Sequence, residues 1–120
     1  MLTREEFKKN PELVFDKAYG SLSGLAIGDS FGDASRKQEN RENYAITTDF
    51  NSKASWSTDD TEFALLTAKT LIRCGGELTS EEVVKSWLED VAIQDEFKRG
   101  GASEIEAANN LRRGFLPTLS

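Results

Sequence analysis

The spacing of apolar residues along the chain predicts a series of helices. Thr3 followed by acidic residues is typical of a helix start, and the Asn10-Pro11 pair would end that short helix, because proline disfavours helical angles in the residue before it. Pro11 then suits the first turn of a second helix. Along this second helix apolar side chains recur at helical spacing, which predicts a face packed against a core: Phe15, Ala18, Tyr19, Leu22, Leu25 and Ala26.

Asp29 occupies the next position of this apolar face. A carboxylate there should be partly buried, and a buried carboxylate needs a hydrogen-bond or metal partner to stay charged. The pattern therefore leaves two interpretations for Asp29, a group of a ligand site or a cap at a helix end.

Glycines recur every fourth residue on the same predicted helix, at Gly20, Gly24, Gly28 and Gly32. Each is less favourable in a helix than alanine by about 1 kcal/mol, so four at one spacing suggest a purpose. Residues four apart form a ridge on a helix, and a ridge of glycines would let another backbone or a flat ligand approach closely. The alternative is that the run from Gly28 to Ala34 is a frayed helix end followed by a turn.

Three further helices are predicted downstream. The first begins at Thr58 and ends at Gly75-Gly76. It is apolar around most of its circumference, so we expect it to be the central buried helix. The second begins at 79–82 with Trp87 as a core anchor, and the last is capped at 103–106 and stops at Gly114. Residues 35–55 lack this periodicity, so we expect a flap-like loop over the acidic segment described next.

The segment Ser57-Thr58-Asp59-Asp60-Thr61 carries the strongest chemical signal of the chain. Its hydroxyl and carboxylate groups crowd the start of an apolar helix, and oxygen ligands suit Mg²⁺, Mn²⁺ or Ca²⁺. The helix N-terminus also favours ionised carboxylates. The same residues have a second interpretation, in which Ser57 or Thr58 is an N-cap and Asp60 or Glu62 closes a capping box.

Composition excludes several classes of function. The chain of 120 residues has a net charge of -6, which argues against a nucleic-acid or anionic-membrane surface. It has one cysteine, Cys74, and no histidine, so the chain alone has no internal disulfide, no Cys/His zinc set and no Ser-His-Asp triad. We expect a single domain over residues 1–120, and a cytoplasmic location, because no basic-then-apolar leader and no membrane-spanning run is found.

Two linked motifs resemble the N-terminal part of the ADP-ribosylglycohydrolase family. The first is Gly24-Leu25-Ala26-Ile27-Gly28-Asp29-Ser30-Phe31-Gly32-Asp33-Ala34, and the second is Trp56-Ser57-Thr58-Asp59-Asp60-Thr61-Glu62-Phe63-Ala64-Leu65. Their order and spacing agree with the family. The resemblance implies an all-α fold, an orthogonal helical bundle, of which this chain would be the N-terminal portion.

The resemblance also implies chemistry. Members hydrolyse the glycosidic bond of ADP-ribose attached to a protein side chain or small molecule, with two Mg²⁺ or Mn²⁺ ions that position the ribose and a water. It assigns Thr58, Asp59 and Asp60 as metal ligands, with Asp59 and Asp60 as the catalytic residues. Asp29, with Gly28 and Gly32, would contact or support the substrate. Nucleic acid is expected only as a modified substrate, and the acceptor type and oligomeric state are left open.

The chain departs from the family pattern in two places. Many members have a glutamate where Arg36 stands, and the Asp-x-Asp-Thr segment that supplies the remaining metal ligands does not occur in this sequence. We therefore expect a fragment that is inactive alone and works with a missing C-terminal part or a complementary chain. The alternatives are a non-catalytic ADP-ribose-binding or crystallin-like structural relative, and an inactive fragment that has no function even with a partner.

Overall fold

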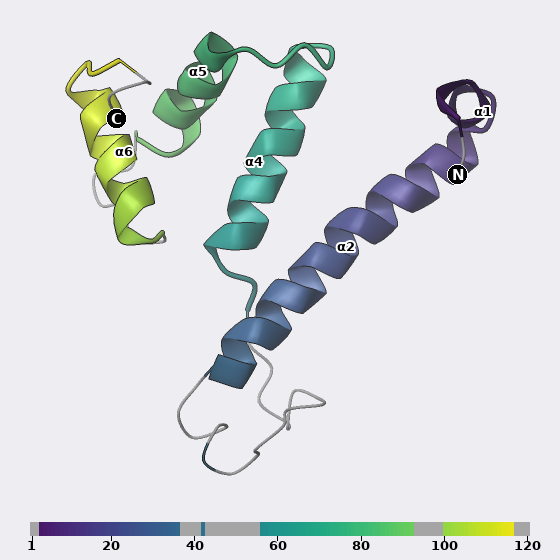
Figure 1. The fold of residues 1–120 in the computed structure, drawn as a ribbon, viewed down its shortest axis with the longest axis horizontal. Coiled ribbons are helices and arrows are strands. Elements are labelled where there is room, and N and C mark those ends of the chain that lie inside the picture. Colours follow the sequence, from purple (N-terminus) through teal and green to yellow (C-terminus); the bar gives the residue numbers. More distant parts are fainter. Residues whose placement is uncertain (1–2, 37–41, 43–55, 93–99, 117–120) are drawn as a thin grey trace. The chain divides into compact units, whose positions relative to one another are not determined.

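A computed structural model of the chain describes residues 3–36, 42, 56–92 and 100–116, and the regular structure in these ranges is all helical (Figure 1). The helices are α1 (Arg4–Lys8), α2 (Pro11–Arg36), α4 (Asp59–Arg73), α5 (Ser80–Asp90) and α6 (Ala102–Arg112). This confirms the all-α prediction. The chain divides into two compact units, Met1–Thr61 and Glu62–Ser120, and each is described by itself.

The first unit begins with the predicted cap. Thr3 and Glu6 form a complete capping box, in which the Thr3 side chain accepts from the Glu6 backbone N–H and the Glu6 carboxylate accepts from the Thr3 backbone N–H. After α1, the backbone N–H of Leu13 donates to the Asn10 side chain at 3.1 Å, which supports the first turn of α2. The start of α2 at Pro11 is as the sequence predicted.

Helix α2 extends through all four of its regularly spaced glycines. It continues without interruption through Gly28 and Gly32 to Arg36, so the interpretation of 28–34 as a frayed end and a turn was wrong. The Ser35 hydroxyl donates to the Phe31 carbonyl at 2.7 Å within the last turn. Ser35 and Arg36 are thus helical rather than part of a loop, and the remainder of the expected flap, apart from Glu42, lies outside the described residues.

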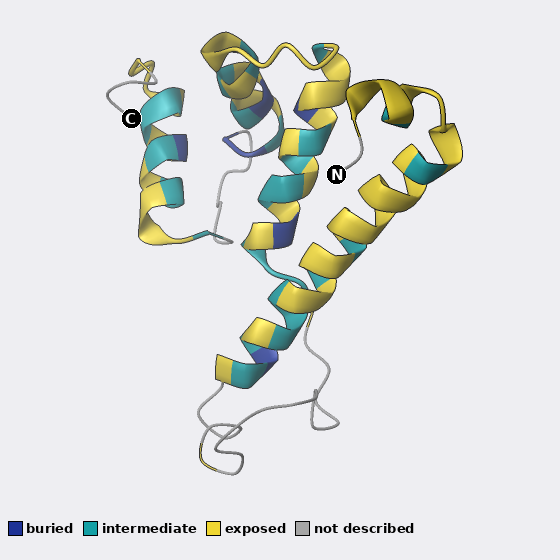
Figure 2. Ribbon diagram, turned by 45° about the vertical axis from the view of Figure 1, so that its right-hand side comes forward, coloured by how far each residue is buried: buried dark blue, intermediate teal, exposed yellow. Residues whose placement is uncertain are grey.

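The apolar face of α2 is largely exposed in this structure, contrary to the prediction of a core-facing stripe. Phe15 and Tyr19 are 70% and 66% exposed and stack on each other with ring centroids 6.0 Å apart. The only fully buried position described on α2 is Ala34 near its end (Figure 2). Burial along α2 is therefore concentrated near its C-terminal end.

The second unit has a small core built from α4, α5 and α6. Val91, Ala92 and Ala108 are buried together, and Phe63, Leu66 and Trp87 pack against them. The rings of Phe63 and Trp87 are stacked with centroids 5.1 Å apart, which agrees with the prediction of Trp87 as a core anchor.

Helix α4 is only partly buried, so its prediction as the central buried helix was wrong. Ile72 is 82% exposed and Leu65 is 51% exposed. Its buried contact with α5 is polar: the Thr70 and Ser86 hydroxyls lie 2.6 Å apart, and Arg73 donates to Ser86 and to the carboxylates of Glu82 and Glu89. Helix α4 is held to α5 by these polar contacts as well as by apolar packing.

Both predicted glycine stops are confirmed by their hydrogen bonds. After α4, Gly76 N–H donates to the Leu71 carbonyl and Gly75 N–H to the Ile72 carbonyl, with positive φ at both glycines. Gly114 ends α6 in the same way. The start of α6 differs from the prediction, because Gly101 is its N-cap and Ser103 lies inside the helix.

Candidate functional site

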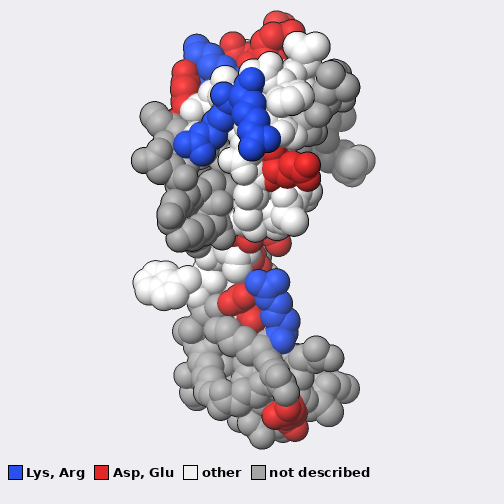
Figure 3. Space-filling view, turned by 90° about the vertical axis from the view of Figure 1, so that its left-hand side faces the viewer, with Lys and Arg blue, Asp and Glu red and all other residues white. Residues whose placement is uncertain are grey.

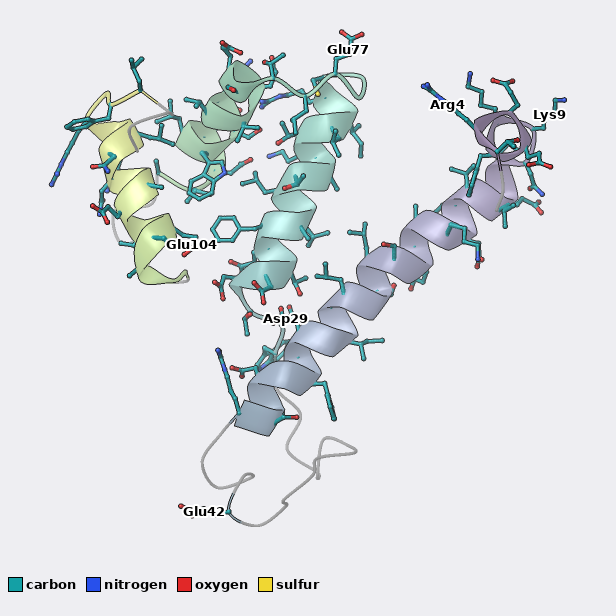
Figure 4. All side chains as sticks on the ribbon, in the orientation of Figure 1. Arg4, Lys9, Asp29, Glu42, Glu77 and Glu104 are labelled. Carbon is teal, nitrogen blue, oxygen red and sulfur yellow. The ribbon has the colours of Figure 1, made fainter. Side chains whose placement is uncertain are left out.

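Asp29 on α2 lies against the segment that leads into α4, and its carboxylate accepts four hydrogen bonds there (Figure 4). Thr58 donates its hydroxyl to Oδ1 and its backbone N–H to Oδ2, both at 2.6 Å. Thr61 donates its hydroxyl to Oδ2 at 2.6 Å and its backbone N–H at 3.2 Å. All these atoms belong to the first compact unit.

These bonds make Asp29 a cap for α4 that comes from another helix. Thr61 is the third residue of α4, and its N–H is one of the groups that the helix itself leaves without a partner. A capping Thr58 hydroxyl would accept from this N–H, but the Asp29 carboxylate accepts it and the Thr58 hydroxyl donates to the same carboxylate. The capping interpretation of Asp29 is thus confirmed, while its role in a ligand site stays a prediction.

The environment of Asp29 keeps it ionised. Desolvation acts to raise its pKa, but the hydrogen bonds from the side chains and backbone of Thr58 and Thr61 together outweigh desolvation and lower the pKa to about 2. The prediction of a partly buried, partnered carboxylate is therefore confirmed for Asp29.

A pocket of about 800 Å³ opens where α2 ends and α4 begins. All six residues that the sequence singled out line it: Gly28, Asp29, Gly32, Thr58, Asp59 and Asp60. Asp59 is half-buried and Asp60 is exposed. The structure brings these residues to one place, while their roles toward a metal or substrate stay predictions.

Three further residues line the same pocket and were not predicted as site residues, namely Leu25, Asp33 and Arg36. Asp33 follows Asp29 by four positions, and this spacing, which places two residues on the same helix face, could have identified it. The Arg36 side chain folds back along α2, and its Nε and Nη2 both donate to Oδ1 of Asp33, at 3.0 and 2.7 Å. The hydrogen bond and charge of Asp33 raise the pKa of Arg36, with smaller contributions from the charges of Asp59 and Asp29.

The glycine ridge has open space over it in the described part of the chain. A Cβ added at Gly20, Gly24, Gly28 or Gly32 would have no neighbouring atom within 4 Å. The expected close approach of another backbone is thus not found in the described ranges, and the approach of a ligand at Gly28 and Gly32 stays a prediction.

Comparison with known protein families supports the resemblance seen in the motifs. The sequence model of the ADP-ribosylglycohydrolase family matches residues 10–120, which include both motifs and the whole pocket lining. The chain belongs to this family. The family is one of hydrolases that act on ADP-ribose conjugates. No curated protein and no solved structure matched the chain.

On the face shown in Figure 3, the Lys and Arg side chains lie beside Asp and Glu side chains. No helix in the described ranges combines the length and the hydropathy that a membrane span requires.

Proposed function

We propose that this chain supplies the N-terminal part of a divalent-metal-dependent centre that hydrolyses the glycosidic bond of ADP-ribose attached to a protein side chain or small molecule. In this proposal Thr58, Asp59 and Asp60 hold Mg²⁺ or Mn²⁺, and Asp59 and Asp60 are the catalytic residues. Asp29, Gly28 and Gly32 form the adjoining substrate wall.

The observation that carries the proposal is the capping of α4 by Asp29. Because Asp29 accepts the N–H of Thr61 and both donors of Thr58, helix capping does not require the carboxylates of Asp59 and Asp60. Asp59 and Asp60 both line the pocket together with Gly28 and Gly32 of α2. Two adjacent aspartates that line a pocket, at a helix start that Asp29 already caps, favour a ligand role over the capping interpretation.

The donor chemistry of the pocket fits part of a hard-metal site. Its lining includes the Asp59 and Asp60 carboxylates and the Thr58 hydroxyl, whose oxygens are the ligand type that Mg²⁺ and Mn²⁺ prefer. Within residues 3–36, 42, 56–92 and 100–116, no group of three or more His, Cys, Asp or Glu side chains is placed to hold an ion. The described residues would accordingly need further ligands to complete the site.

Divalent ions bound there would neutralise the carboxylates, orient ribose hydroxyls and lower the pKa of a bound water. Asp29 would act as a positioning residue, because its bonds to Thr58 and Thr61 fix the start of α4 and hence the backbone that carries Asp59 and Asp60. At Gly28 and Gly32 the open space over α2 would admit a flat or extended part of the substrate.

The proposal is tested by calorimetric titration of Mn²⁺ and Mg²⁺ into the wild type and into a variant with Asp59→Ala and Asp60→Ala. We expect measurable binding by the wild type and at least a tenfold loss in the variant, since two charged ligands are removed. A matched control is Glu12→Ala with Asp16→Ala, which removes the same charge from exposed positions near the start of α2.

The control variant should bind the ions as the wild type does. Equal binding by the wild type and the Asp59/Asp60 variant would reject the metal assignment. An equal loss in both variants would also reject it, because the effect would then reflect net charge alone. Circular dichroism of each variant checks that the helix content is unchanged.

A further inference from the structure

Among the described residues that line the pocket, Arg36 is the cation and the other charged residues are all carboxylates, namely Asp29, Asp33, Asp59 and Asp60. It is the last residue of α2, where the helix dipole favours a positive charge. The side chain is held toward the pocket by two hydrogen bonds to Oδ1 of Asp33, of 3.0 and 2.7 Å. A guanidinium held by two N–H donors has a more defined position than an ammonium would have.

The charge of Arg36 acts on more of the pocket than its direct partner. Asp59 and Asp29 both interact with the guanidinium through their charges, although neither forms its main ion pair. The interaction with Asp59 links a residue at the end of α2 to the first residue of α4 across the pocket lining. A cation bound by Asp59 would therefore lie in the field of a second, permanent cation.

We propose that Arg36 is a fixed counter-charge of the acidic pocket and lowers its affinity for divalent cations. The inference rests on the proposed metal site at Thr58, Asp59 and Asp60 and adds a residue that regulates its occupancy. Two electrostatic effects would lower the affinity: the guanidinium attracts the carboxylates that would bind the ion, and it repels the ion itself.

The size of the effect follows from simple electrostatics. The Arg36 side chain is 73% exposed, so water screens its charge and the interaction with a dication is modest. We expect removal of the charge to raise the affinity for Mn²⁺ by about threefold to tenfold at low ionic strength. The gain should shrink as salt is added, because the Debye length falls to about 8 Å at physiological ionic strength.

The test titrates Mn²⁺ into the wild type, Arg36→Gln, Arg36→Lys and Lys17→Gln by calorimetry, at low and at physiological salt. Lys17→Gln is the matched control, since it removes one positive charge from an exposed position of the same helix. Lys17 and Arg36 are 19 positions apart on α2, or about 28 Å at 1.5 Å per residue. Helix content of every variant is followed by circular dichroism.

We expect Arg36→Gln alone to bind Mn²⁺ more tightly than the wild type. Arg36→Lys and Lys17→Gln should bind it with an affinity close to that of the wild type. Equal, measurable affinities of all four proteins would overturn the inference and leave the metal site standing. Tighter binding by Lys17→Gln as well would also overturn it, since net charge would then explain the gain. Weaker binding by Arg36→Gln would show that Arg36 supports the site and would overturn the inference too. No binding by any of the four proteins would overturn the proposed metal site itself, and this inference with it.

Discussion

The Asp29 carboxylate accepts both the hydroxyl and the backbone N–H of Thr58, each at 2.6 Å, although the two residues are 29 positions apart in the sequence. Thr61 adds two further donors to Oδ2 of the same carboxylate. One side chain of α2 thus fixes the start of α4, and the residues between Thr58 and Thr61 are the two aspartates proposed to bind metal. The position of the candidate ligands depends on this contact.

The first prediction concerns the strength of this contact. Asp29→Asn keeps the size of the side chain but removes the charge and places an amide N–H₂ among groups that are all donors. We expect the free energy of unfolding to fall by about 1–3 kcal/mol, the range for loss of charged hydrogen bonds and of a cap. Urea unfolding followed by circular dichroism measures it. Asp16→Asn, an exposed residue of the same helix, is the control and should change stability by less than about 0.5 kcal/mol.

A double-mutant cycle separates the contact from general effects of the substitution. Thr61→Val removes the buried hydroxyl that donates to Oδ2 and keeps the shape of the side chain. The two substitutions together should destabilise by less than the sum of the single changes, with a coupling of about 1 kcal/mol. Strict additivity would contradict a direct interaction between Asp29 and Thr61.

The second prediction concerns the pH dependence of stability. The pKa of Asp29 is lowered from 3.8 to about 2 in the folded chain, so its stabilisation is fully present above pH 3.8 and is lost as pH falls through 2. The difference in unfolding free energy between the wild type and Asp29→Asn should therefore be constant above about pH 5 and shrink steadily between about pH 4 and pH 2. Urea titrations at a series of pH values measure this difference. A difference that stays constant down to pH 2 would contradict the assignment.

Local signals in the sequence predicted much of the helical framework. Thr3 with Glu6, Pro11, Thr79 and the glycine pair at 75–76 each act within one helical turn, where the hydrogen-bond requirement of a helix end decides the structure. The grouping of Gly28, Asp29 and the Thr58 segment was also expected, on the basis of the family motifs rather than of periodicity. Family membership then followed from the match over residues 10–120.

The features that the sequence did not predict depend on contacts between distant residues. The partners of Asp29 are donors on another helix, and no spacing rule links Asp29 to Thr61. Helix α2 continues through four glycines, although each lowers helix stability by about 1 kcal/mol relative to alanine. Helix formation is cooperative over its 26 residues, and the contact of Asp29 with Thr58 anchors its C-terminal part. The apolar pattern of α2 predicted burial, but a pattern does not specify what covers the face, and Phe15 and Tyr19 are exposed.

The third prediction uses the glycine ridge, because only two of its four members line the pocket. Alanine at Gly20, Gly24, Gly28 or Gly32 meets open space, so each substitution should stabilise the chain by up to about 1 kcal/mol through helix propensity. If the pocket binds ADP-ribose with Mn²⁺, Gly28→Ala and Gly32→Ala should weaken that binding several-fold, because the methyl group occupies ligand space. Gly20→Ala and Gly24→Ala, which lie outside the pocket lining, should bind as the wild type. Thermal unfolding measures the change in stability, and calorimetric titration measures the change in ADP-ribose affinity. Equal ADP-ribose affinities in all four variants would show that Gly28 and Gly32 do not contact the substrate.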